Sequence, residues 1–301
     1  YRPDFRFGHK EVRHTYKYAV QITSSTGVFK FAVLINRMFA LYLPPGMISI
    51  FDYAFNLVQN FSTLLRSFVN AVFPSLTQAS HDREPGAVRR FLDMALRAMA
   101  VVGLPMTALI WMLRTPLVKL FERGEFNAEV TMQVSQTVAY LAPCILLFPM
   151  MYLLIRLFAV MQQTRLLTAL GVMCMALIAL FDAVFLDRGV TGMALGNTLA
   201  LCVTVAACWF LLSKDLGRMN TALVVPAMFK AAGSAAAGIA GVYCAGLFLP
   251  DVGPVDALPR ILLILGVKGA AGVMSALAAL LLLRTREVVD AFGFLRKAVG
   301  K

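Results

Sequence analysis

Apolar residues along this chain gather in eight long runs, separated by short segments that are polar, charged or rich in Pro and Gly. The runs cover approximately residues 18–43, 46–77, 91–113, 130–160, 166–186, 190–213, 225–249 and 260–283. Each is close to or above the roughly 20 residues that an α-helix needs to cross the hydrocarbon core of a bilayer. The pattern predicts an all-α fold, a polytopic membrane helix bundle with about eight transmembrane helices.

The second run carries a continuous polar stripe. At about 100° per residue, six polar side chains fall within roughly 40° of one direction: Asp52, Asn56, Gln59, Thr63, Arg66 and Asn70. The opposite face is apolar and contains Ile50, Tyr53, Ala54, Leu57, Phe61, Leu64, Phe68 and Val72. Because an unsatisfied polar group facing lipid is costly, we predict that the stripe faces a water-filled cavity or a polar partner helix.

Further cations lie inside the predicted spans. In the first run, Lys30 and Arg37 share a face with two threonines, and the Pro44-Pro45-Gly46 turn predicts an antiparallel hairpin with the second run. The two stripes can then line one cavity and bind an anionic group, or form a structural seam in which Asp52 pairs with Lys30 or Arg37.

Three other cations within or near the runs have simpler interpretations. Arg97 and Arg156 lie near predicted cytoplasmic ends, so we expect their long side chains to reach the membrane surface. Lys268 sits deep in the last run beside Gly266, Gly269 and Gly272, where a headgroup contact and a helix-packing contact are both open.

Composition supports a membrane protein. Hydrophobic residues make up 59% of the 301 residues, 15% are charged, and the mean hydropathy is +0.75, against about 25% charged residues in soluble domains. The net charge of +12 does not indicate nucleic-acid binding, because most Lys and Arg residues fall in alternate connecting segments and in both termini. This asymmetry predicts cytoplasmic termini and contacts with anionic membrane lipids. The segments on the external side hold only Arg114, Lys119, Arg123, Arg188 and Arg260.

The runs divide the chain into three parts. Residues 1–17 form a basic cytoplasmic segment, 18–213 a six-helix lobe, and 214–301 two further helices with a basic tail. A chain that opens on Tyr1 within a cytoplasmic segment leads us to expect a piece of a longer protein. Between the third and fourth runs, Thr115-Pro116 predicts the start of a short interfacial helix, and Asn127 predicts an N-cap.

Motifs for other chemistry are absent from the sequence. The five cysteines lie inside runs without CxxC spacing, and the three histidines form no metal-ligand pair. Neither a phosphate-binding glycine loop nor a nucleophile elbow is present. We therefore expect no catalytic residues, no metal and no cofactor, and predict that the protein is not an enzyme.

Several motifs resemble the second half of one membrane protein family. The runs LINRMFALYLPPGMISIFDYAFNLVQ and FPSLTQ, then LVKLFERGEFNAEVT, RLFAVMQQTR and GVTGMALGNTLA, resemble the MurJ/MviN lipid II flippases in order and spacing, up to about residue 218. The last two runs match that family in position and character. At one place the chain departs from the family: Tyr53-Ala54 is followed by Phe55-Asn56, where the family has Asp-Arg.

The resemblance implies a fold of two six-helix lobes around a cationic cavity, plus two extra helices. This chain would supply the second lobe and the extra pair, and the first lobe would come from the same chain or from a separate subunit. The implied location is the bacterial inner membrane, and the implied activity is flipping a polyprenyl-diphosphate-linked saccharide to the outer leaflet. Site residues would be Lys30, Arg37, Asp52, Asn56, Gln59, Arg66 and Lys268.

Other functions stay open at this point. The chain could be a flippase for another lipid-linked oligosaccharide, or a membrane scaffold with a degenerate flippase fold that does not transport. An exporter of small amphiphilic drugs fits the fold but not the cationic stripes.

Overall fold

Long α-helices connected by short segments make up the described part of the chain. The computed structural model describes residues 34–81, 86–122, 127–161, 163–215, 221–248 and 258–283. Within these residues the helices are α2 (Met47–His81), α3 (Ala87–Lys119), α4 (Ala128–Leu141), α5 (Cys144–Val160), α6 (Thr164–Phe185), α7 (Gly189–Asp215), α8 (Thr221–Phe248) and α9 (Leu258–Leu282). A 3₁₀ turn, η1 (Leu186–Arg188), joins α6 to α7. The all-helical bundle predicted from the apolar runs is confirmed.

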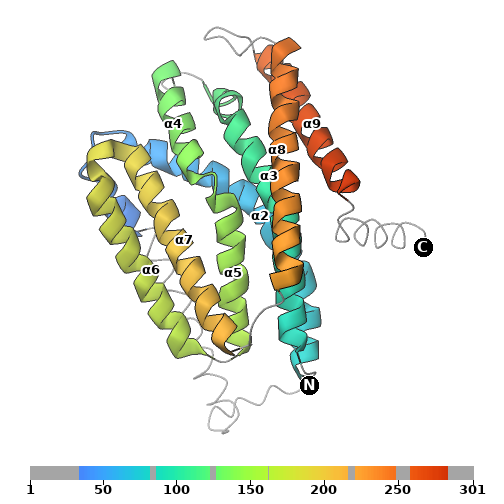
Figure 1. The fold of residues 1–301 in the computed structure, drawn as a ribbon. Coiled ribbons are helices and arrows are strands. Elements are labelled where there is room, and N and C mark those ends of the chain that lie inside the picture. The colour runs from blue at the N-terminus through green and yellow to red at the C-terminus, as the bar shows by residue number, and fades with distance from the viewer. Residues whose placement is uncertain are drawn as a thin grey trace, which may run out of the picture.

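The apolar helices are long enough to cross a membrane. Among the described residues, four stretches qualify by length and hydropathy: Leu92–Lys119, Thr164–Lys214, Val225–Phe248 and Pro259–Leu282. The second is 51 residues long, about twice what one crossing needs, and it folds back at η1 so that α6 and α7 pack side by side (Figure 1). The bent pair α4–α5 brings the number of qualifying stretches to five.

Prolines and glycines shape the helix ends in two places, of which the sequence analysis predicts the second. Pro143 separates α4 from α5, whose axes differ by 44°. The Pro44-Pro45-Gly46 turn leads into α2, with Gly46 at a φ of 92°, a conformation that glycine adopts without strain. Residues 34–40, on the other side of this turn, are helical. The rest of the first predicted span lies outside the described residues.

The segment after the third predicted span differs from expectation. Asn127 is the N-cap of α4, as predicted, and its side chain accepts a hydrogen bond from Val130 N at 3.0 Å. The expected helix start at Thr115-Pro116 is wrong, because α3 continues through Pro116 to Lys119. A proline breaks a helix only if the lost hydrogen bond and its ring cannot be accommodated, and the long α3 accommodates both Pro105 and Pro116.

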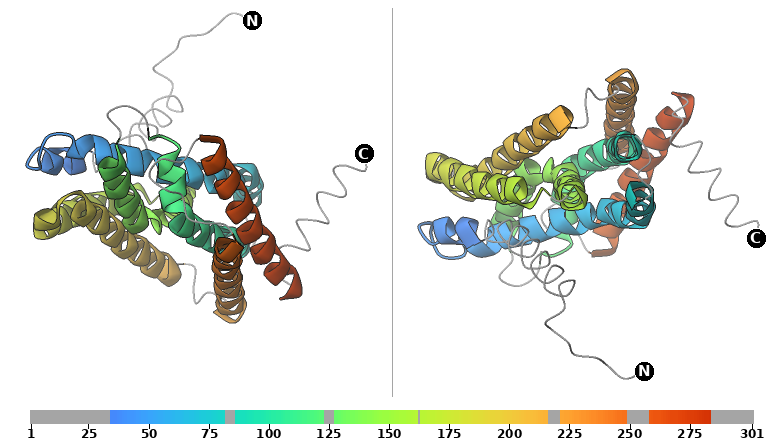
Figure 2. Two further views of the ribbon diagram at one scale, coloured as in Figure 1. Left: turned by 90° about the horizontal axis from the view of Figure 1, so that it is seen from above. Right: turned by 90° about the horizontal axis from the view of Figure 1, so that it is seen from below.

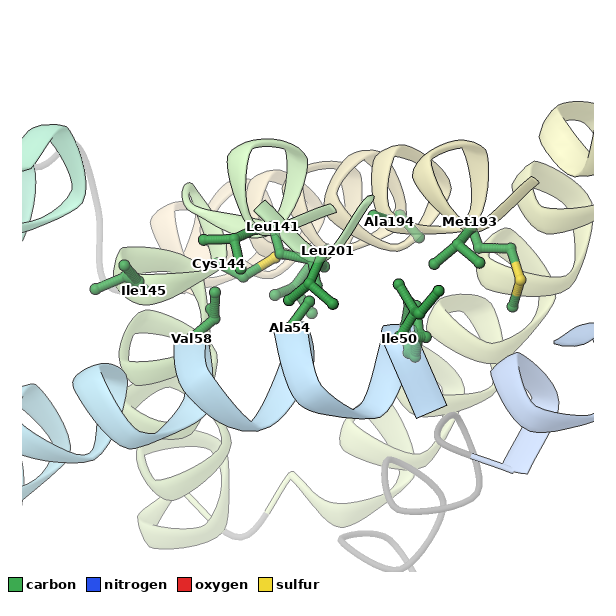
Figure 3. Close-up of a cluster of buried hydrophobic side chains, with 14 of the residues drawn as sticks. Ile50, Ala54, Val58, Leu141, Cys144, Ile145, Met193, Ala194 and Leu201 are labelled. Atoms are coloured by element: carbon green, nitrogen blue, oxygen red, sulfur yellow. The ribbon is translucent and has the colours of Figure 1, made fainter. Parts of the chain in front are cut away.

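A continuous apolar core joins α2, α4, α5 and α7. Figure 3 shows Ala54 and Val58 of α2 directed toward Leu141, Cys144 and other buried side chains of the neighbouring helices. A second cluster joins α5 to α3, α6 and α7 around Leu154, Leu157 and Phe158, and all three of these side chains are fully buried. These clusters place α5 at the centre of the lobe.

The last two helices pack as a pair against α3 (Figures 1 and 2). A Cβ added at Gly241 of α8 would meet Ala271 O of α9 at 2.8 Å, so this crossing requires glycine. Gly272 is similarly crowded by the side chains of Leu109 and Val242. Small residues therefore permit close helix packing, as their spacing predicts, although Gly266 faces open space.

Candidate functional site

The outer face of α2 is polar and exposed. α2 runs along one side of the bundle, opposite to α6 and α7 (Figure 2). Its exposed polar side chains begin with Ser49 and then recur every three or four residues from Asn56: Asn56, Asn60, Thr63, Ser67 and Asn70. We call these six residues the α2 polar face. No described residue covers this face, although the helix belongs to a bundle with membrane-spanning helices.

Three members of the predicted stripe, two of them charged, lie along one flank of the α2 polar face. Asp52, Gln59 and Arg66 repeat every seven residues and are half-buried. On the opposite side of α2, Ile50 and Ala54 are buried as expected, whereas Tyr53 and Leu64 are 55% and 64% exposed. The helix therefore has three sectors: a buried one, a polar exposed one, and between them an apolar exposed one at Tyr53 and Leu64.

Two predicted site residues contact each other across the turn before α2. Arg37 Nη2 donates a hydrogen bond to Asp52 Oδ2 at 3.3 Å, and the side chains are 55% and 33% exposed. This contact shows that Arg37 lies alongside the start of α2. It is the pairing that the structural-seam interpretation anticipates. Lys30, the other candidate partner, lies outside the described residues.

Arg66 lies between α2 and α5. Its guanidinium carbon is 5.9 Å from the ring centroid of Phe148 and 5.8 Å from that of Tyr152. The Nε atom is buried and has no hydrogen-bond partner among the described residues. A buried donor without an acceptor is rare in folded proteins, so Arg66 is a strong candidate for a ligand contact.

Arg156 joins Arg66 at the same aromatic ring. Its guanidinium carbon lies 4.5 Å from the Tyr152 centroid, and its Nη2 donates a hydrogen bond to the Tyr152 hydroxyl. That hydroxyl donates in turn to Asn70 Oδ1 at 3.0 Å. We call Arg66, Asn70, Tyr152 and Arg156 the Tyr152 cluster. From its position near a predicted span end, Arg156 was expected to reach the membrane surface. The contact between Tyr152 of α5 and Asn70 of α2 could not be predicted from the sequence, because it depends on how the two helices pack.

Lys268 lies in a different part of the bundle. Its side chain is 7% exposed and lies between α8 and α9, where a Cβ added at Gly246 would be 3.7 Å from Lys268 Nζ. Because α9 packs chiefly on α8 and α3, Lys268 is not brought to the α2 polar face. Whether Lys268 contacts a headgroup or serves helix packing stays a prediction.

A second buried polar group was not anticipated. Asp182 of α6 is fully buried, and neither of its carboxylate oxygens has a hydrogen-bond donor among the described residues. Asn197 lies on α7, the other helix of the α6–α7 hairpin, and its Oδ1 accepts a hydrogen bond from Asn36 Nδ2 at 3.2 Å. A Cβ at Gly196 would lie 3.1 Å from Asp182 Oδ1, so glycine admits the carboxylate against α7. The sequence feature that could have indicated this buried group is the position of Asp182 inside the apolar run 166–186.

Metal-binding chemistry has little support in the described residues. No group of three or more His, Cys, Asp and Glu side chains is close enough to hold a metal ion within them. The five cysteines are all free, and Cys144 lies 3.2 Å from Thr198 Oγ1 within the core.

Helices alone, several of them long and apolar enough to cross a bilayer, define the described part of the chain as a polytopic membrane helix bundle. The family model described as lipid II flippase MurJ matches residues 1–262, so the chain belongs to the MurJ family. The match extends beyond residue 218, where the motif resemblance ends.

Individual proteins agree with this assignment. A lipid II flippase MurJ from Burkholderia cenocepacia is 27% identical over 133 residues, which are 44% of this chain and 26% of that protein. A solved structure of lipid II flippase MurJ in an inward closed conformation has a TM-score of 0.70 at 17% identity. It is matched over 86% of this chain and 52% of that one, so this chain spans about half the length of that protein.

A more distant likeness concerns the fold alone. A MATE protein crystallised in complex with MaD3S has a TM-score of 0.59 at 12% identity, with 94% of this chain and 69% of that chain covered.

Proposed function

We propose that this chain is the second lobe, with the last two helices, of a flippase. Its substrate would be a polyprenyl-diphosphate-linked saccharide of the lipid II type, moved from the inner to the outer leaflet of the bacterial inner membrane. The observation that carries the proposal is the exposed α2 polar face in a MurJ-family membrane bundle. In lipid such a face is costly, whereas it suits one wall of a cavity that admits a polar headgroup.

The charges near this face favour an anionic headgroup. Arg37, Arg66 and Arg156 lie beside α2 or on its flank, and Asp52 neutralises only the first of them directly. Cations in a low-dielectric cavity reduce the cost of moving a diphosphate out of water. The hydrophobic tail stays in lipid throughout. The proposed activity is transport, and it requires no covalent step at any residue.

The exposed α2 polar face also indicates that this lobe needs a partner lobe. Alternating access requires two lobes that move against each other around a site between them. The α2 polar face is then the wall that meets the first lobe, which would belong to the same chain or to a separate subunit. We further expect both termini in the cytoplasm, in accordance with the charge asymmetry.

Reconstitution tests the transport function. The 301-residue chain is purified and placed in liposomes with a fluorescent polyprenyl-diphosphate saccharide, with and without a MurJ-family first lobe supplied as a separate protein. Flipping, read as accessibility of the label to an external quencher, is expected only with both lobes. Failure of the two-lobe liposomes to flip this lipid, while they flip another lipid-linked oligosaccharide, would transfer the proposal to that substrate.

One observation favours the scaffold alternative. Phe55, at the place of the family's Asp, stacks on Phe51 at 5.8 Å and meets the Phe148 ring edge-on at 5.5 Å. This side chain therefore packs against α5 and does not supply a charge to the cavity. A chain with this change that flips no lipid beside any first lobe would be a scaffold.

A further inference from the structure

Two guanidinium groups from different helices share one aromatic ring. Arg66 comes from α2 and Arg156 from α5, and their guanidinium carbons lie 5.8 Å and 4.5 Å from the centroid of Tyr152. The two like charges therefore lie beside the same partly buried ring, where repulsion between them is stronger than in water. The ring offsets part of this cost through cation–π attraction.

Other cation–π pairs in the described residues have a simpler form. Arg114 lies 4.7 Å from the ring of Trp111, three residues earlier on α3, and donates to Trp111 O. Arg188 lies 5.4 Å from Phe185, again three residues earlier. Such pairs arise from the neighbouring positions of one helix. The Tyr152 cluster differs because tertiary packing brings a second cation to a ring already occupied by a local one.

The hydrogen bonds of the cluster leave donor groups on Asn70 and Arg66. Asn70 uses its carbonyl oxygen to accept from the Tyr152 hydroxyl, so its amide NH₂ remains as a donor on the exposed side. Arg66 Nε is buried and has no acceptor among the described residues. Two guanidinium forks and an amide supply many donors and few acceptors, which is the chemistry that recognises phosphate.

The cluster also opens onto the α2 polar face. Asn70 belongs to that face, whereas Phe148 closes the cluster on the side of the core. A headgroup that moves along the face would therefore meet both arginines at its edge.

We propose that the Tyr152 cluster is a binding site for the phosphate or diphosphate group of a lipid headgroup, with Arg66 and Arg156 as the charged ligands and Tyr152 as the residue that positions them. This inference rests on the proposed function and names the residues that hold the anionic part of the transported lipid. An anion between the two guanidinium groups replaces their repulsion with two charge-assisted contacts, and Tyr152 with Asn70 fixes their orientation.

Direct binding tests the site without requiring transport. The full 301-residue chain is placed in nanodiscs of phosphatidylcholine and titrated with farnesyl diphosphate, with inorganic pyrophosphate as a probe lacking a lipid tail. A parallel set of nanodiscs contains phosphatidylglycerol, which distinguishes a prenyl diphosphate from ordinary anionic lipid. The variants are Arg66→Gln, Arg156→Gln and Tyr152→Phe. Arg114→Gln, which removes an arginine from an aromatic ring elsewhere, is the matched control.

The expected result is weaker binding of farnesyl diphosphate, by about tenfold for each of the two arginine variants. Tyr152→Phe keeps the ring but loses both hydroxyl contacts, so we expect a smaller loss of about threefold. Arg114→Gln should bind as the wild type does. If either glutamine variant fails to fold, Arg66→Lys and Arg156→Lys retain the charge without the planar fork, and binding should still weaken.

Three results would overturn the site. Wild-type binding that the cluster variants leave unchanged would place the diphosphate elsewhere, and absence of any wild-type binding would remove the site altogether. Arginine-dependent binding of phosphatidylglycerol without binding of farnesyl diphosphate would make the cluster an anchor for bulk lipid and contradict the proposal. Flipping by the two-lobe liposomes is measured separately, so each of these failures is distinguishable from failure of the proposed function.

Discussion

Arg37 and Arg66 are both cations beside α2, yet their surroundings differ. Arg37 has a carboxylate partner in Asp52 and is largely exposed, whereas Arg66 is half-buried against two aromatic rings with an unsatisfied Nε. An exposed ion pair contributes about 0–1 kcal/mol to stability. Arg37, which is paired with a carboxylate, fits the structural-seam interpretation, whereas Arg66, whose Nε has no partner among the described residues, fits the cavity interpretation. Substitutions at the two residues can therefore distinguish the interpretations.

Replacing Arg37 or Arg66 with Ala should reduce transport in two-lobe liposomes while the protein remains folded at near-normal levels. Glu at either position should reduce transport further than Ala does, because it repels an anionic headgroup. The measurements are the initial flipping rate and the amount of folded protein after purification. Normal transport by both Ala variants would refute the cavity interpretation, and disappearance of both proteins from the membrane would favour the seam.

Asn56 offers a gain-of-function test. It is exposed on the α2 polar face, at the place of the family's arginine. Because Asn56 is exposed, Asn56→Arg should fold normally and increase affinity for farnesyl diphosphate by about threefold to tenfold, as one added charge-assisted contact would. The comparison is Asn56→Gln, which lengthens the side chain without charge. Equal affinities of the two variants would show that the headgroup does not reach this part of α2.

At the scale of helices, close packing of α8 on α9 depends on particular glycines. Gly241 has the α9 backbone at Ala271 beside it, whereas Gly266 of the same helix pair has nothing within 4 Å of an added Cβ. The two positions provide a matched pair, since both lie inside long helices.

Gly241→Ala should lower stability by about 1–3 kcal/mol because the helices must separate. Gly266→Ala should leave stability unchanged or raise it by up to about 1 kcal/mol, since Ala is the better helix former. Unfolding in detergent followed by circular dichroism measures both. Equal stabilities of the two variants would mean that the α8–α9 contact is looser than the structure has it.

The orientation of the helices is a prediction of the charge asymmetry. In a variant without the native cysteines, His14→Cys or His81→Cys should react with an impermeant maleimide only after the membrane is opened. Gly253→Cys should react in intact spheroplasts. Labelling of position 81 from outside would contradict the eight-span arrangement with cytoplasmic termini.

At the scale of the whole molecule, the proposed function makes this chain one wall of a cavity. A monomeric 301-residue chain is therefore expected not to flip lipid by itself, and a first lobe or a second copy should be required. Liposome flipping combined with cross-linking to determine the oligomeric state measures this. Robust flipping by a chain shown to be monomeric would contradict the two-lobe account.

Much of this protein could be predicted from the order of its residues. Apolar runs long enough to cross a bilayer specify helices, because the backbone must satisfy its own hydrogen bonds there. The polar stripe on α2, the turn at Pro44-Pro45-Gly46 and the N-cap at Asn127 depend on local spacing and local chemistry. The turn and the N-cap were found as predicted, and the polar residues of α2 lie on its exposed and half-buried sides, whereas the cavity that they were predicted to line stays a prediction.

Only the tertiary structure decided which polar groups meet. Tyr152 and Arg156 lie more than 80 positions from Arg66 and Asn70, and no local pattern specifies that α5 packs against α2 at this height. The same holds for Asp182, whose burial depends on the hairpin of α6 and α7, and for Lys268, which packing removes from the α2 polar face. Helices form from local contacts, whereas the pairing of their faces follows from how the apolar surfaces fit together, and this fit determines the sites.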